Sequence, residues 1–92
     1  MIADLVATVL IYRSGGIFRA ECAAFDLVAT AGSPEDAKEE VLRLVRRRLS
    51  QLAEERELDA FLAAAGFVVD NGVLRTEDRL VSAGEVIVTV PL

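Results

Sequence analysis

The joint at Gly32 constrains the fold more than any other part of this chain. A strand pattern runs into Gly32, and a helix then begins with every expected start signal. The Ser33 hydroxyl can accept a hydrogen bond from a free backbone N–H group, and Pro34 suits the first helical position. Glu35 and Asp36 place negative charge where the helix dipole is positive. The sequence therefore predicts a strand that passes directly into a helix.

Two helical segments are predicted after this joint. The first runs from residue 34 to about residue 55, because apolar residues recur at spacings of three and four and form one stripe. These residues are Ala37, Val41, Leu44, Val45, Leu49 and Leu52. The second segment, 58–65, ends at Gly66. Residues 54–59 between them are compatible with a bend or with one continuous helix.

Four segments have the alternating or two-sided apolar pattern of β-strands. They are residues 5–12, 17–22, 27–31 and 85–90. Ser14-Gly15-Gly16 predicts a tight hairpin between the first two, because glycine tolerates a positive φ. Asn71-Gly72 predicts a further small hairpin within residues 67–75.

Together these elements predict a single α+β domain over residues 1–92, in the order β-β-β-α-(α)-β, with a mixed sheet. The helix is a crossover, so the strand at 85–90 is expected to lie parallel to the first strand and beside it. The helices form a layer on one face of the sheet only. Because 5–12 and 85–90 are apolar on both sides, the other face predicts self-association to a dimer or tetramer. The alternative is that residues 58–84 fold back over that face.

Composition restricts the available chemistry. The chain has no histidine and a single cysteine, Cys22, which excludes an intrachain disulfide and a cysteine-based zinc site. The formal net charge of −5 opposes non-specific binding to nucleic acid. The apolar run at 5–12 is far shorter than the roughly 20 residues that span a bilayer, and no basic leader precedes it. We therefore expect a cytoplasmic protein with no signal peptide and no membrane contact.

Two features of the sequence are candidates for a functional site. Arg46-Arg47-Arg48 is a basic run, but consecutive helical residues point about 100° apart, so a solvated helix flank is the preferred interpretation. The alternative is contact with an acidic partner or RNA. Cys22 lies on the inward face of its strand and is interpreted as a core side chain.

A metal-dependent nuclease would need several carboxylates around two metal ions. Asp4, Glu21 and Asp26 could come from neighbouring strands, but Glu21 lies on the polar face of its strand, and no acidic residue interrupts the core of the first strand, where a metal ligand would be expected. We expect no catalytic, metal-binding or cofactor-binding residues and hence no enzyme.

The joint at Gly32 resembles that of HicB-like antitoxin domains, in which a three-stranded meander passes into a helix through a G-x-[ST]-x-E-E-A-like turn. The likeness covers most of residues 5–65, and the ending Val90-Pro91-Leu92 is also similar to that of the family. Residues 18–22 stand where the family has Y-x-A-x-x-P, and 25–27 where it has a "peLpG" turn, but the prolines are missing here.

This resemblance implies a partial RNase H-like fold and a bacterial toxin–antitoxin system. In such a system a homo-oligomer binds and occludes a small basic RNA-cleaving toxin of the HicA type. The chain ends at Leu92 without the DNA-binding segment of full antitoxins, so a solo domain without direct nucleic-acid binding is expected. The alternative is an orphan homo-oligomeric scaffold, or a small-molecule sensor domain, with no toxin partner.

Overall fold

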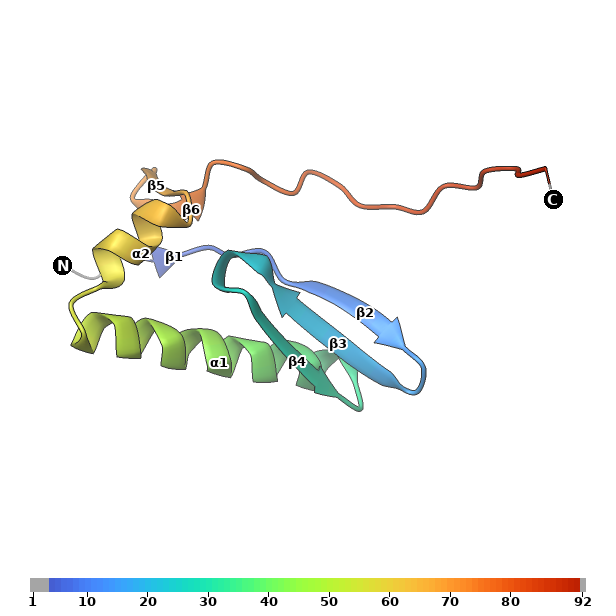
Figure 1. The fold of residues 1–92 in the computed structure, drawn as a ribbon, viewed down its shortest axis with the longest axis horizontal. Helices are drawn as coiled ribbons and strands as arrows, with labels where there is room; N and C mark the ends of the chain where they lie inside the picture. Colours follow the sequence, from blue (N-terminus) through green and yellow to red (C-terminus); the bar gives the residue numbers. More distant parts are fainter. Residues whose placement is uncertain (1–3, 92) are drawn as a thin grey trace.

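The computed structural model describes residues 4–91 and shows an α+β domain followed by an extended segment (Figure 1). The expected α+β class, with one mixed sheet and a helix packed against strands, is confirmed. The elements are β1 (Asp4–Leu5), β2 (Leu10–Ser14), β3 (Ile17–Cys22), the 3-10 turn η1 (Ala23–Phe25), β4 (Leu27–Ala31), α1 (Pro34–Glu54), α2 (Leu58–Ala64), β5 (Phe67–Asp70) and β6 (Val73–Thr76).

The larger layer of the fold is the meander β2-β3-β4, with β3 at its centre and both pairings antiparallel. Helix α1 lies along one face of this sheet and packs mainly against β3 and β4 (Figure 1). The sheet contributes small side chains to the contact, and Ala20, Cys22 and Ala29 are buried there. The helix buries Ala37, Val41, Val45 and Leu52. The inward side chains of β3 therefore pack against the apolar stripe of α1, as predicted.

The start of α1 has the predicted cap. The Ser33 Oγ accepts a hydrogen bond from the backbone N–H of Asp36 at 3.1 Å, and Pro34 occupies the first turn. At the other end the backbone of Arg56 is left-handed, with φ 58°. This residue breaks the helix, so 54–59 form a bend and not one continuous helix. Helix α2 then ends before Gly66, whose φ is 84°.

The smaller sheet has the order β1-β6-β5. The hairpin predicted within 67–75 is confirmed as β5-β6, and both turn residues, Asn71 and Gly72, have positive φ. Strand β6 also pairs parallel with β1, so that Asp4 faces Val73. The ring of Phe25, from η1, lies 5.5 Å from Phe61 and 5.8 Å from the hairpin's Phe67, measured between centroids. These rings join the two sheets through α2.

The prediction of one strand over 5–12 is wrong. The chain forms β1, leaves it, and enters β2 at Leu10, with residues 6–9 in no strand. The physical reason is that β1 and β2 belong to different sheets, because β1 pairs with β6 whereas β2 pairs with β3. Apolar alternation indicates an extended chain but does not say which neighbour each part of it has.

The prediction of a strand at 85–90 is also wrong. Residues 77–91, called the C-terminal tail here, form no strand and run away from the domain (Figure 1). The parallel position beside β1 is taken by β6, and the tail pairs with no strand among residues 4–91. The radius of gyration is 16.0 Å, against about 12 Å expected for a compact chain of this length.

Candidate functional site

The face of the meander that points away from α1 is the main candidate for a functional surface. Strand register places alternate residues of all three strands on it, and we call these the open face. They are Leu10, Tyr12, Ser14, Ile17, Arg19, Glu21, Val28 and Thr30. The exposed fractions of the larger apolar members are high, at 41% for Tyr12, 47% for Ile17 and 50% for Val28. No helix covers them, as the sequence predicted for this face.

A charged pair occupies the centre of the open face. Arg19 and Glu21 both lie on β3, and the Arg19 Nε is 3.1 Å from the Glu21 Oε1. That nitrogen is shielded from solvent but has no hydrogen bond of good geometry to any described residue. The guanidinium also lies over the ring of Tyr12 on the neighbouring strand. The face is therefore not uniformly apolar, which the sequence had indicated only through the outward position of these two residues.

The outer edge of β2 is the second feature of this surface. Among residues 4–91, β2 pairs only with β3, so one side of its backbone has no described strand beside it. Helix α1 barely reaches this strand, and Ile11 is 40% exposed although it lies on the helix side of the sheet. The segment that leads into the strand is partly covered, because the Val6 N–H donates to the Leu74 carbonyl at 2.8 Å and Thr8 faces the start of the tail. We call the outer side of β2, residues 10–14, the free edge.

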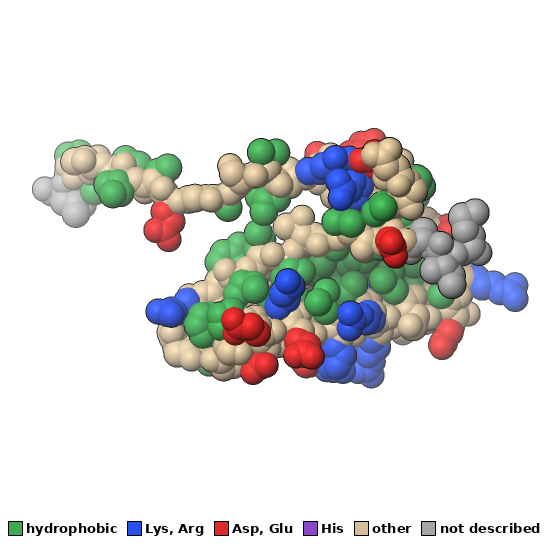
Figure 2. Space-filling view, turned by 180° about the vertical axis from the view of Figure 1, so that it is seen from behind, with side chains coloured by type: hydrophobic (Ala, Val, Ile, Leu, Met, Phe, Trp, Pro, Cys, Tyr) green, Lys and Arg blue, Asp and Glu red, His purple; other side chains and the backbone are tan. Residues whose placement is uncertain are grey.

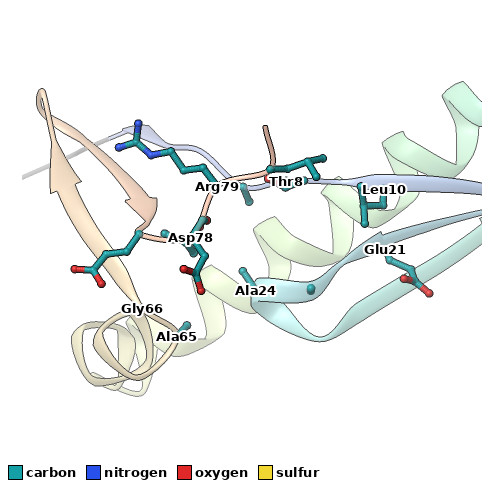
Figure 3. A pocket seen from close by; sticks show the side chains of 13 residues that line it. Thr8, Leu10, Glu21, Ala24, Ala65, Gly66, Asp78 and Arg79 are labelled. Atoms are coloured by element: carbon teal, nitrogen blue, oxygen red, sulfur yellow. The ribbon is translucent and has the colours of Figure 1, made fainter. Parts of the chain in front are cut away.

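The start of the tail forms a hollow against one corner of the open face (Figure 3). Its volume is about 570 Å³, and Thr8, Leu10, Glu21, Ala24, Asp78 and Arg79 lie around it. The alternative that residues 58–84 cover the face is thus limited to this corner. The hairpin β5-β6 stands at the end of the meander and pairs with β1 instead (Figure 1).

The tail is attached at its base and free beyond it. The backbone N–H of Glu77 donates to the carbonyl of Gly66 at 3.3 Å, and Arg79 forms an ion pair with Asp70. Farther along, Val86 is 86% exposed and Ile87 is 100% exposed. Figure 2 shows the tail clear of the rest of the molecule, with hydrophobic side chains along it. Sequence reasoning missed this free segment because its strand pattern was assumed to have a partner within the chain.

The other predicted features are structural. Cys22 is completely buried, and this burial raises the pKa of its thiol, so it is the core residue that was predicted. Arg46 and Arg47 are exposed, whereas the guanidinium carbon of Arg48 lies 5.7 Å from the centroid of the Phe61 ring. The three arginines therefore do not form one basic patch.

The three carboxylates considered for metal binding are not brought together. Asp4 lies on β1, Glu21 on the open face, and Asp26 in the turn before β4. Among residues 4–91, no three His, Cys, Asp or Glu side chains are grouped so that they could hold a metal ion. Nothing in this part of the chain supplies the ligand set of a two-metal nuclease.

Comparisons with protein-family models, curated proteins and solved structures found no match to this chain. The resemblance to HicB-like domains therefore stays a prediction. Neither of the two helices described is both long and apolar enough to traverse a bilayer.

Proposed function

We propose that this chain is a non-enzymatic protein-binding module that self-associates through the open face and the free edge. Its accessible surface carries the proposal. The chain exposes 7294 Å², whereas a monomer of 9.9 kDa is expected to expose about 5,200 Å². The excess is larger than the roughly 800 Å² that each partner buries in a standard protein interface. The extended tail accounts for much of this excess, since its large apolar side chains are the most exposed, such as Val86 and Ile87. The open face adds Ile17 and Val28, and burial of these side chains favours association.

Light scattering during size exclusion tests this proposal, and a dimer or tetramer is expected at micromolar concentration. Val28→Asp places a charge on the open face and is expected to shift the protein toward monomer. Val69→Asp is the matched control, because Val69 is 72% exposed on β5, away from that face. A wild-type protein that stays monomeric at every concentration would contradict self-association.

As the particular function, we propose an antitoxin-like role in which the chain binds and occludes a small basic RNA-cleaving toxin of the HicA type. The resemblance at the Gly32 joint supports this, and so does the net charge of −5. Asp36, Glu39 and Glu40 line a shallow hollow between α1 and β4 together with Arg43 and Arg46, and Arg43 forms an ion pair with Glu40. Three acidic and two basic side chains leave the hollow with a net charge of −1. Acidic groups on one surface favour a basic partner and accelerate its association.

Calorimetric titration with a purified HicA-type ribonuclease tests this role. Binding is expected to weaken as salt rises, since exposed charges are screened. Glu39→Lys is expected to weaken binding several-fold, whereas Glu57→Lys, the same charge change beyond the far end of α1, is expected to have little effect. Absence of binding at low salt would contradict the antitoxin role and leave self-association standing.

The hollow beside Thr8 and Ala24 supports a second candidate, a small-molecule sensor domain. Its volume of about 570 Å³ falls within the roughly 300–1,000 Å³ of ligand pockets. Small apolar side chains make up much of its lining. Binding of an apolar fluorescent dye that Ala24→Trp abolishes would favour this function, and dye binding unchanged by that substitution would count against it.

A further inference from the structure

The C-terminal tail contains a strand-like sequence at residues 85–90, but this segment is not paired with any described strand. Residues 85–90 alternate β-forming side chains on both faces, and Val86, Ile87 and Val88 are exposed by 86%, 100% and 72%. Among residues 4–91, no backbone–backbone hydrogen bond involves the tail beyond Glu77. Such a segment is expected to gain hydrogen bonds and apolar burial if a strand edge is offered to it.

The free edge offers that partner. Strand edges in soluble proteins are usually protected by charges, prolines or a covering segment. Strand β2 reads Leu-Ile-Tyr-Arg-Ser, contains no proline and has Arg13 as its single charge. Among residues 4–91 no second strand lies on this side of β2, and α1 covers β3 and β4. Apart from Arg13, the edge is therefore an open template for one more strand.

We propose that residues 85–90 of one copy pair with the free edge of a second copy, and that the exchange is reciprocal. This inference rests on the proposed self-association and names one contact within it, at the free edge. The exchanged strand takes the place that the sequence predicts for the last strand, but in the partner.

A second copy fits better than another protein because each chain carries both halves of the contact. Reciprocal exchange pairs two tails with two edges and closes a two-fold dimer with no strand edge left over at β2. The tail is long enough, since the twelve residues 80–91 beyond the ion pair of Arg79 with Asp70 span up to about 40 Å when extended. Figure 1 shows that this segment already points away from its own domain.

The test compares two proline variants of the full chain by light scattering. Proline at residue 87 removes the N–H group of a central strand position, so Ile87→Pro is expected to give a monomer. Val81→Pro is the matched control, because Val81 is 94% exposed but lies before the strand, and it is expected to stay dimeric. Both variants are expected to keep the helical part of the far-ultraviolet circular dichroism, since neither residue contacts α1 or α2, whereas Ile87→Pro is expected to lose the contribution of the exchanged strand.

Mixed dimers of isotope-labelled and unlabelled copies show which chain each tail contacts. Nuclear Overhauser contacts between residues 86–90 and residues 10–14 are expected only between copies, and tail amides are expected to be protected from hydrogen exchange. Contacts within one copy would overturn the exchange in favour of a tail folded onto its own β2. A dimer that Ile87→Pro leaves intact would overturn the exchange while self-association stands. A wild-type monomer would overturn both.

Discussion

The guanidinium of Arg19 lies over the ring of Tyr12, with its central carbon 5.0 Å from the ring centroid. The two residues face each other directly across β3 and β2, on the open face. The same guanidinium reaches Glu21 along its own strand, so one side chain joins an aromatic ring to a carboxylate. This arrangement gives the centre of the open face a fixed pattern of charge within apolar surroundings.

A double-mutant cycle of Tyr12→Ala and Arg19→Ala is expected to give a coupling of about 0.5–1 kcal/mol in the free energy of unfolding. The physical reason is the attraction between the cation and the electron-rich face of the ring. Urea denaturation of the four proteins at one protein concentration measures it. The cycle of Tyr12→Ala with Arg47→Ala, an exposed arginine on α1, is expected to give no coupling.

Ser33→Ala is expected to lower the free energy of unfolding by about 1 kcal/mol, because it removes the side-chain acceptor for the N–H of Asp36. Urea denaturation measures the loss. Ser82→Ala, in the exposed tail, is the control and is expected to change stability by less than about 0.5 kcal/mol. Equal effects of the two substitutions would show that the cap contributes nothing.

Arg56→Gly is expected to raise the free energy of unfolding by about 0.5–1 kcal/mol. Arg56 has a left-handed backbone with φ 58°, which costs any residue with a Cβ roughly 1 kcal/mol. The same change at Arg47, inside α1, is expected to lower stability by about 1 kcal/mol, because glycine disfavours a helix interior. Opposite signs in thermal or urea unfolding are the expected outcome, and destabilisation by both would contradict it.

The Cys22 thiol is expected to make stability fall at high pH. Burial raises its pKa above the ordinary value of 9.0, and backbone hydrogen bonds with Phe25 and Ala24 only partly offset this. Below the unfolded pKa the thiol is neutral in both states and its contribution is fully present. As pH rises through that value the unfolded state loses the proton first, so the free energy of unfolding declines until the folded pKa is passed.

Urea denaturation between pH 7 and 10 measures this decline, and Cys22→Ala is the control that lacks it. In the folded protein the thiol is also expected to react slowly with an alkylating reagent and quickly after unfolding, because the thiolate is the nucleophile. Identical pH profiles for the two proteins would contradict a raised pKa.

Capping and turn residues in the sequence correctly predicted the parts of this fold that depend only on residues adjacent in the chain. Ser33 and Pro34 marked the start of α1 correctly, and Gly66 marked the end of α2. Turn residues at Gly15 and at Asn71-Gly72 placed both hairpins, because glycine and asparagine tolerate the positive φ that such turns require. The inward and outward sides of β3 also followed from alternation alone.

The candidate site was predicted in part. One uncovered sheet face was predicted by counting helices against the apolar sides of 5–12 and 85–90. Residues 85–90 are not in the sheet, and Tyr12, Ile17 and Val28 supply the exposed apolar surface in their place. The ion pair of Arg19 with Glu21 at its centre did not follow, because its place depends on how three strands align. The free edge and the hollow against the tail depend on contacts between distant segments, which periodicity does not encode.

By itself, then, the sequence determined the helices, the turns and which sides of the meander are apolar, since these depend on the conformations and polarity of adjacent residues. Tertiary structure alone decided that Asp4 pairs with Val73, that the run at 5–12 divides between two sheets, and that 85–90 is left unpaired. A strand pattern states only that a segment is extended. Its hydrogen bonds belong to whichever distant backbone reaches it, and here β6 reached β1 in place of the tail.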